Sequence, residues 1–418
     1  MPTLSVFEDV PFAQKLEGSL LKVYKQDEHP KKIFLSFRVC LTEQGLPWVS
    51  PVVPKIRQQL SRDPSLNYEY LPEMGMKSFI HASLSLLFGK YSSVIKENRA
   101  GGLHTVGDSG AFHLGAAFLK IWHQKSKEVH IISSQKEHHG HIFKDMGFTV
   151  HEHCFWNASQ LCMDPSLIFS AVEEAPQDCI CVLGNFGSLT MTKTQWLQFM
   201  SILKSKNIFP FFDIPSQGFF SGDLEEDTRF LQYFVRHRFE FFCSQFLSRN
   251  FGIYDEGVGV LVAVTVSNEA LLCVLSQMMS LARALWLNPP NTGARIITSI
   301  LSNSALRGEW KQSLSEMVEN IILVKEKVKE KLRLLGTPGV WDHITDQKGS
   351  HCYLGLNDQQ LDYLIKKKHI YVSKNGRINL TCVNASNIDY IVESINEAVV
   401  LIRNSEQMSS ESTHYWLE

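Results

Sequence analysis

Short apolar runs alternate with amphipathic segments through most of this 418-residue chain, and this alternation restricts its possible folds more than any other feature. The apolar runs are typical of buried strands, and they cover Val129–Ile132, Cys179–Leu183, Ile208–Phe212, Phe239–Cys243 and Val258–Val266. Segments with helical periodicity, such as Thr194–Lys204 and Glu269–Trp286, follow several of these runs. Because strands that alternate with helices form a mainly parallel sheet covered on both faces, we predict an α/β fold.

Two polar turns next to such runs are candidate ligand sites. The stretch Cys243–Gly259 connects the last two apolar runs, and doubly wound folds bind ligands in the loops that leave the sheet. The turn Gly107–Gly110 leads into the helical segment Ala111–Trp122, where free backbone N–H groups at the start of a helix favour an anion. Many helices begin in this way, so the second signal alone is weak.

Composition indicates a cytoplasmic protein. The formal net charge of -2 provides no overall field that would favour nucleic acid or a membrane as partner. The nine cysteines are odd in number and contain no CxxC pair, which is typical of thiols in a reducing compartment. The amino-terminal residues do not form a secretory signal, and no stretch approaches the roughly 18 apolar residues of a membrane helix.

Histidines gather at positions 138, 139, 141, 151 and 153. Only three of them lie within one short segment, and no other ligand pattern accompanies them, so we predict no metal site here.

The segment Phe246–Tyr254 resembles the cofactor-lysine segment of the aspartate aminotransferases, which reads Ser-Phe-Ser-Lys-Asn-Phe-Gly-Leu-Tyr in that family. The resemblance extends from about Ser5 to Arg403 and includes the segments Ser5–Pro11, Phe211–Asp213, Asn288–Pro290 and Trp341–Gln347. It implies the pyridoxal-phosphate-dependent transferase fold type I, with a large domain around a mainly parallel sheet, a smaller α+β domain and a homodimer. The reaction of that family is amino-group transfer between L-aspartate and 2-oxoglutarate, with pyridoxal phosphate as cofactor.

The resemblance and the helical periodicity together predict the division of the chain. We expect an N-terminal arm at 1–15, part of the small domain at 16–45, the large cofactor-type domain at 46–312 and the small C-terminal domain at 313–404. Helices are predicted at Leu314–Leu334, Asp358–Lys367 and Asn387–Ile402, with short strands around Tyr371 and Ile378. The serine-rich tail 405–418 is expected to be disordered.

Several residues match functional positions of the family. The resemblance assigns Asp213 to the pyridinium nitrogen of the cofactor, His139 to the position behind it, and Asn185 to the ring oxygen. Ser109, together with Tyr70 of the partner subunit, is assigned to the phosphate. A deletion just before Asn185 makes that assignment the least secure.

Two arginines match the family's substrate-binding pair. Arg377 corresponds to the arginine that binds the α-carboxylate, and Arg283 to the one that the partner subunit offers to the distal carboxylate. Guanidinium groups bind carboxylates with two hydrogen bonds, so this pair implies a dicarboxylic ligand.

Other positions differ in ways that affect the chemistry. Arg249 stands where the family has its lysine, and a guanidinium cannot lose a proton to attack the cofactor aldehyde. In the phosphate site, Phe246 replaces a serine, Gly257 an arginine and Asp108 a glycine. A carboxylate about 4 Å from a phosphate charge would cost about 4 kcal/mol at an effective dielectric constant of about 20. Three more departures lie around the ring and the substrate, at Ser216, Lys136 and Arg38.

Three interpretations follow from this mixture. The first is a catalytically degenerate aspartate aminotransferase homologue, in which Arg249 forms an ion pair with Asp213 or Asp108. The second is an active aspartate aminotransferase, or another aspartate-metabolising enzyme such as a racemase, with a non-covalently bound cofactor. The third is an interaction subunit that pairs with an intact homologue, whose site Tyr70 and Arg283 would complete.

Overall fold

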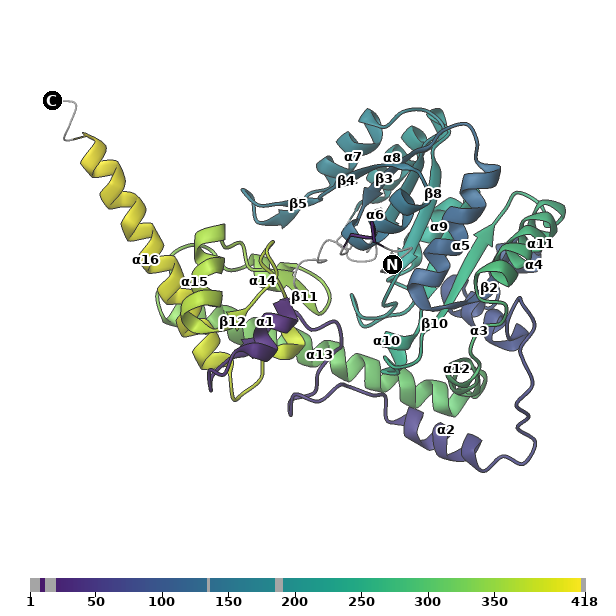
Figure 1. Ribbon diagram of the computed structural model, residues 1–418, viewed down its shortest axis with the longest axis horizontal. Helices are drawn as coiled ribbons and strands as arrows, with labels where there is room; N and C mark the ends of the chain where they lie inside the picture. The colour runs from purple at the N-terminus through teal and green to yellow at the C-terminus, as the bar shows by residue number, and fades with distance from the viewer. Residues whose placement is uncertain (1–7, 12–19, 134–135, 185–190, 415–418) are drawn as a thin grey trace, which may run out of the picture. The chain divides into compact units, whose positions relative to one another are not determined.

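The computed structural model describes residues 8–11, 20–133, 136–184 and 191–414 (Figure 1). The chain divides into two compact units, of which one comprises Val39–Leu323 and Thr345–Ser350. The other comprises Met1–Arg38, Val324–Ile344 and His351–Glu418. The first boundary along the chain follows Arg38 and the second follows Leu323, whereas the expected boundaries follow residues 45 and 312. Most of the expected N-terminal arm lies outside the described residues.

A seven-stranded sheet forms the centre of the larger unit, in the order β2-β10-β9-β8-β7-β3-β4. Its strands are β2 (Ala100–Val106), β3 (Glu128–Ile132), β4 (Thr149–His153), β7 (Ile180–Gly184), β8 (Phe209–Ile214), β9 (Phe241–Phe246) and β10 (Val258–Val264). Strand β10 runs antiparallel to both β2 and β9, whereas the pairs from β9 to β4 are parallel. The predicted mainly parallel α/β sheet is therefore confirmed.

Helices cover both faces of this sheet, because successive residues along its strands point to opposite sides. On β8, Phe211 packs into one apolar cluster, to which α5 and α11 contribute, and Phe212 packs into another. Figure 1 shows α5 and α11 near the β2 end of the sheet, in this unit. The helices of the unit are α2 (Val52–Ser61), α3 (Lys77–Phe88), α4 (Ser93–Lys96), α5 (Gly107–Trp122), α6 (Lys136–Asp145), α7 (Pro165–Glu174), α8 (Lys193–Ser205), α9 (Arg229–Arg236), α10 (Ser248–Phe251), α11 (Asn268–Leu285) and α12 (Thr292–Ser302). A two-stranded hairpin, β5 (Trp156–Asn157) and β6 (Cys162–Met163), completes it.

The four-residue helix α10 packs against the core through its buried residues, although it is too short to be stable alone. The Phe251 ring stacks on Trp310, with ring centroids 4.6 Å apart, and Trp310 Nε1 donates to the Asn250 carbonyl at 2.8 Å. Gly252 ends the helix at φ +70°, which favours glycine. A Cβ atom there would also meet the Trp48 carbonyl, so the close approach of these two backbone segments requires a glycine as well.

The smaller unit is built from both ends of the chain. Strand β1 (Ile33–Phe34) pairs in parallel with β12 (Ile370–Tyr371), and β11 (His351–Tyr353) pairs antiparallel with β13 (Arg377–Asn379). Its remaining elements are α1 (Leu20–Gln26), α15 (Asp358–Lys368), the short 3₁₀ helix η2 (Leu380–Cys382) and α16 (Ile388–His414). Two further helices, α13 (Ser304–Leu334) and α14 (His343–Asp346), contain residues of both units.

Two helices extend beyond their predicted limits. Helix α13 begins at Ser304 rather than Leu314, because its one glycine, Gly308, weakens a helix without ending it. Helix α16 continues to His414, into the tail that we expected to be disordered. The residues from Ser405 to His414 include neither glycine nor proline, so the sequence contains no strong helix terminator there.

Candidate active site

Asp213 and His139 lie together in the buried interior, Asp213 near the carboxyl end of β8. Both side chains are 0 % exposed, and His139 Nε2 lies 3.5 Å from Asp213 Oδ2. Neither oxygen of Asp213 and neither ring nitrogen of His139 has a hydrogen-bond partner among the described residues. The imidazole of His139 stacks on Phe112, with ring centroids 4.1 Å apart. Buried polar groups are nearly always paired, so this couple is unusual.

Burial moves the pKa of each group toward its neutral form. The pKa of Asp213 is well above its ordinary value, mainly because the carboxyl is buried and secondly because of the charge of Asp108, while Arg249 acts in the opposite direction. The pKa of His139 is lowered to about 3 by burial, with a smaller contribution from His138. Burial therefore favours the neutral form of both groups, and His139 is neutral near pH 7.

Asp108 turns its carboxylate toward this couple from the first turn of α5. One ligand atom from each of Asp108, His139 and Asp213 lies within 4.8 Å of the other two. Ser244 Oγ donates to Asp108 Oδ1 at 3.2 Å, and the β8–β9 register pairs Ser244 with Asp213. The side chain of Asp108, which replaces the family's glycine, is therefore held by a hydrogen bond to the neighbouring strand.

The remaining backbone around this turn is tightly packed. A Cβ atom built on Gly107, at φ +66°, would lie 3.8 Å from the ring of Phe246 and 3.6 Å from Gly257 Cα. A Cβ atom on Gly259 would lie 2.8 Å from the Gly107 carbonyl oxygen. Phe246 therefore places an aromatic edge beside the turn where the family has a hydroxyl, and Gly257 places no side chain there.

Arg249 projects from α10, and its Nη1 donates to Ser216 Oγ at 3.1 Å. Both Arg249 and Ser216 are departures from the family pattern, so two replaced residues now contact each other. The expected pair with Asp213 is not formed as a hydrogen bond, since both Asp213 oxygens lack a partner. The suggested pair between Arg249 and Asp108 stays a prediction.

The charge of Arg249 also acts on a neighbouring pair that the sequence did not suggest. Tyr254 Oη accepts a hydrogen bond from the Cys40 backbone N–H at 3.1 Å. Burial raises the pKa of the Cys40 thiol and of the Tyr254 hydroxyl, and Arg249 opposes both shifts. Ser244 was missed in the same way, although its spacing of two residues from Phe246 places both on one face of β9.

Tyr70 and Arg283 lie at the surface, on segments that contact each other. Tyr70 is 81 % exposed, and the Arg283 guanidinium lies 3.6 Å from Glu73 Oε1 in an exposed ion pair. Asn288 Nδ2 donates to the Leu71 carbonyl, which also joins the two segments. Ser109, also exposed, shares a 3.0 Å hydrogen bond with His138 Nε2.

Arg377 and Arg38 belong to the smaller unit. Arg377 begins β13, where its backbone pairs with that of Tyr353. Burial raises the pKa of the Cys352 thiol, and the charge of Arg377 opposes this shift. Arg38 is exposed. Asn185 and the side chain of Lys136 lie outside the described residues, so their assignments stay predictions.

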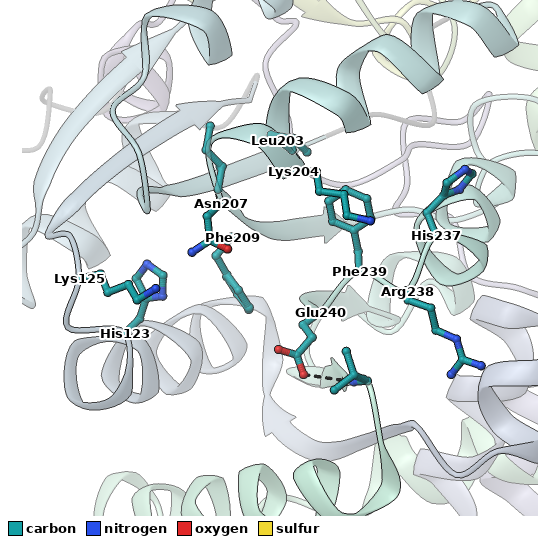
Figure 2. Close-up of a pocket in the computed structure, with 12 residues that line it drawn as sticks. His123, Lys125, Leu203, Lys204, Asn207, Phe209, His237, Arg238, Phe239 and Glu240 are labelled. Atoms are coloured by element: carbon teal, nitrogen blue, oxygen red, sulfur yellow. Dashed lines mark hydrogen bonds between the residues drawn. The ribbon is translucent and has the colours of Figure 1, made fainter.

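A cavity of about 370 Å³ lies near the amino ends of β8 and β9, whereas Asp213 lies near the carboxyl end of β8 (Figure 2). Its basic lining residues are His123, Lys125, Lys204, His237 and Arg238. Glu240 also lines it and accepts a hydrogen bond from the Val266 N–H at 3.1 Å. None of the predicted site residues contributes to this cavity.

Pyridoxal phosphate fits one part of the candidate site and does not fit two others. The buried carboxyl of Asp213 lacks a partner and would suit a ring nitrogen. Arg249 cannot form the covalent bond. The turn around Gly107, which the family resemblance assigns to the phosphate, carries the Asp108 carboxylate and lies beside the Phe246 ring, and neither group donates a hydrogen bond to a phosphate. The donor set therefore does not fit the covalently attached cofactor.

Comparisons with known proteins agree with the fold and the resemblance. Residues 30–395 match the family model described as aminotransferase class I and II. A Bos taurus protein named "Putative aspartate aminotransferase, cytoplasmic 2" is 67 % identical over 407 residues, which cover 97 % of this chain and 100 % of the relative. The cytoplasmic aspartate aminotransferase of Gallus gallus is 37 % identical over 409 residues, covering 96 % of this chain and 99 % of the relative.

Solved structures of aminotransferases share the fold. The aspartate aminotransferase from Saccharomyces cerevisiae cytoplasm has a TM-score of 0.88 and 27 % identity, and the match covers 95 % of this chain and 99 % of that one. An aromatic-amino-acid aminotransferase from Burkholderia pseudomallei, covalently bound to pyridoxal phosphate, has a TM-score of 0.89 and 28 % identity, with 95 % and 100 % covered. Among the described residues, no helix is both long and apolar enough to span a membrane.

Proposed function

Because the chain belongs to the class I and II aminotransferase family, we propose that it is a cytoplasmic, degenerate aspartate aminotransferase that no longer transaminates through covalent pyridoxal phosphate. The observation that supports this proposal most directly is the hydrogen bond of 3.1 Å from Arg249 Nη1 to Ser216 Oγ. A guanidinium stays charged at any accessible pH, so it can neither attack an aldehyde nor carry a proton between carbon atoms. Its contact with Ser216 gives it a structural role at the position of the family's lysine.

The changed phosphate site supports the same proposal independently of Arg249. Asp108 adds negative charge and is hydrogen-bonded to Ser244. Gly257 provides no cation, and Phe246 provides no hydroxyl. Since a dianionic phosphate is bound through donors and positive charge, these three residues lower the affinity for the cofactor even without a covalent bond.

We propose that the protein keeps recognition of a dicarboxylic amino acid or oxo acid through Arg377 and Arg283. The exposure of Arg283 and Tyr70 supports a subunit-contributed role, because exposed residues on joined segments are available to a second chain. A homodimer is the first arrangement to test. A heterodimer with an intact homologue would use the same two residues to complete the partner's site.

One observation favours a second candidate, an aspartate-metabolising enzyme with a non-covalently held cofactor. Asp213 and His139 keep the family's residue types, are fully buried and have no hydrogen-bond partner in the described residues. An unpaired buried carboxyl costs free energy, so a ligand with a ring nitrogen would relieve that cost.

Absorbance spectroscopy of the purified protein with added pyridoxal phosphate tests the proposal. We expect no shifted aldimine band and, after borohydride treatment, no reducible adduct on any peptide. An adduct mapped to a lysine, Lys136 being the first to examine, would overturn the proposal. Binding without an adduct, together with turnover of aspartate, would support the second candidate.

A further inference from the structure

Two parallel strands at one end of the sheet bring three metal-ligating side chains to one place. Strand β3 contributes Glu128 and His130, and β4, the last strand in the sheet order, contributes His151. The register pairs His130 directly with His151 and Glu128 with Thr149, two residues before His151. Residues two apart on a strand share a face, so all three side chains point to the same side of the sheet.

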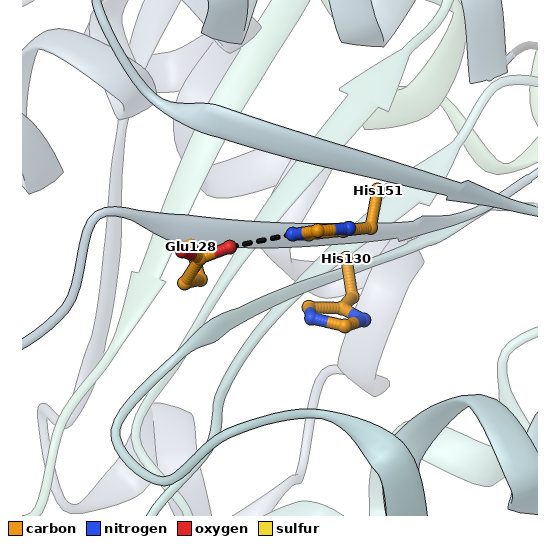
Figure 3. A group of neighbouring side chains, drawn as sticks. All are labelled: Glu128, His130 and His151. Atoms are coloured by element: carbon orange, nitrogen blue, oxygen red, sulfur yellow. Dashed lines mark hydrogen bonds and ion pairs between the residues drawn. The ribbon is translucent and has the colours of Figure 1, made fainter.

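Their ligand atoms are already close together. One ligand atom from each of the three residues lies within 4.8 Å of the other two, and His151 Nε2 lies 2.6 Å from Glu128 Oε2 (Figure 3). The rings of His130 and His151 stack with centroids 4.7 Å apart. Donor atoms about 2.0–2.1 Å from a tetrahedral zinc ion are separated by about 3.3 Å, so small side-chain shifts suffice to coordinate an ion.

The second observation concerns His130, which is 5 % exposed. Its Nδ1 shares a hydrogen bond of 2.9 Å with His153 Nε2, whereas its Nε2 is buried without a hydrogen-bond partner among the described residues. When Nδ1–H donates to His153, the tautomer leaves the lone pair on Nε2. A ligating histidine almost always has its other ring nitrogen held in this way by an outer partner.

We propose that Glu128 Oε2, His130 Nε2 and His151 Nε2 bind a divalent transition metal ion, best matched by zinc, and that His153 orients His130. Two imidazoles and one carboxylate form a known zinc ligand set that leaves a fourth position for water. The side chains of Glu128 and His151 are 35 % and 47 % exposed, so water can reach that position. The ion would join strand β4 to β3.

The register, and not the histidine-rich stretch, creates this site. Glu128 and His130 lie outside the set of five histidines for which the spacing predicted no metal site, and they become neighbours of His151 only when the strands pair. The site is separate from the buried group of Asp108, His139 and Asp213.

Zinc titration of the full-length protein, after removal of metal with a chelator, tests the proposal. A chromophoric chelator that competes for zinc reports affinity and stoichiometry. We expect one tightly bound zinc ion per chain, with affinity reduced at least about 10-fold in Glu128→Gln and His151→Ala, and about 10-fold in His153→Ala. The exposed His81→Ala is the matched control for losing a histidine, and Asp108→Asn the control for the buried group; both should bind as the unchanged protein does.

The absorption spectrum of cobalt bound to the unchanged protein identifies the type of ligand, so this test does not rely on the folding of any variant. Cobalt bound by imidazole and carboxylate has no thiolate charge-transfer band, whereas cobalt bound by the protein's cysteines has one. Unchanged zinc affinity in Glu128→Gln and His151→Ala, a thiolate band, or no binding at micromolar zinc would each overturn the proposal. Circular dichroism of Glu128→Gln and His151→Ala confirms that these surface variants remain folded.

Discussion

The carboxylates of Asp108 and Asp213 approach within 4.8 Å of each other, and neither oxygen of Asp213 has a hydrogen-bond partner among the described residues. Two acids this close cannot both ionise easily in a buried place. The charge of Asp108 therefore adds to burial in raising the pKa of Asp213. The Asp108 carboxylate thus changes the protonation of the residue best suited to a cofactor ring.

Asp213→Asn is expected to stabilise the protein at and above neutral pH. An acid with a raised pKa makes the folded state bind more protons than the unfolded state, so stability falls as pH rises above the ordinary value of 3.8. Because an asparagine amide does not titrate, the substitution removes this fall, which amounts to about 1.4 kcal/mol for each pH unit over which only the folded state holds the proton. Urea unfolding at pH 5, 6.5 and 8 measures it.

The exposed Asp145→Asn is the matched control for this variant and should leave the slope unchanged. Asp108→Asn should act in the same direction as Asp213→Asn and less strongly, because it removes only the neighbouring charge. Parallel curves for Asp213→Asn and the unchanged protein would show that Asp213 does not titrate abnormally.

His139→Gln is expected to flatten the loss of stability on the acid side. Burial lowers the pKa of His139 to about 3. Between about pH 6.5 and pH 3, the histidine is therefore protonated in the unfolded state and neutral in the folded state. Stability attributable to this group is complete above pH 6.5 and is reduced by about 2–3 kcal/mol at pH 4.5. Urea unfolding between pH 4.5 and 7.5 measures the slope, with the exposed His81→Gln as control. Burial also lowers the pKa of His104 to about 4. Part of the loss of stability at acid pH therefore remains in every variant. Equal slopes for His139→Gln and the control would contradict the prediction.

Within the central sheet, the sequence predicted the apolar strands and missed the two in which glycine and polar residues predominate. All five apolar runs became strands of the central sheet, because continuous apolar character is what a strand buried on both faces requires. Strand β2 was missed because it contains Gly101 and Gly102, which carry no apolar signal. A Cβ atom on Gly102 would lie 2.8 Å from the Leu261 carbonyl oxygen, so close strand contact, rather than apolar pattern, determines that residue. Strand β4 was missed because it is a polar strand at the end of the sheet.

The candidate site was predictable in its residues and not in its contacts. The family resemblance provided Asp213, His139 and Asp108, and the structure brings these three together. It could not provide the bond from Ser244 to Asp108 or the contact of Arg249 with Ser216, because Asp108, Arg249 and Ser216 all depart from the family pattern. Contacts between replaced residues depend on side-chain geometry, which a family motif does not contain.

Gly252→Ala is expected to destabilise the protein far more than Gly147→Ala. Both glycines have positive φ, +70° and +84°, so both substitutions introduce the backbone strain of about 1–2 kcal/mol. The new Cβ atom at Gly147 would have no atom within 4 Å, whereas at Gly252 it would lie 2.5 Å from Val49 Cα. We expect an additional loss of about 1–3 kcal/mol in Gly252→Ala, the range for overpacking. Thermal and urea unfolding of the two variants measure the difference, and equal losses would show that the α10 loop shifts without cost.

Restoring the family residues in stages separates the lost covalent bond from the lost phosphate site. Arg249→Lys alone is expected to give little or no reducible adduct with pyridoxal phosphate, because Asp108, Phe246 and Gly257 still oppose the phosphate. The fourfold variant Arg249→Lys, Asp108→Gly, Phe246→Ser, Gly257→Arg is expected to form an adduct at position 249, with cofactor affinity at least about 100-fold higher than in the single variant. Two recovered charge-assisted hydrogen bonds, each worth about 1.5–3 kcal/mol, account for that factor.

Borohydride reduction followed by peptide mapping gives the attachment site, and spectroscopic titration gives the affinity. The triple variant that keeps Arg249 is the control, expected to bind the cofactor without an adduct. If Arg249→Lys alone bound and attached the cofactor as well as the fourfold variant, the changes around Gly107 would have no bearing on cofactor binding, and Arg249 alone would account for the loss.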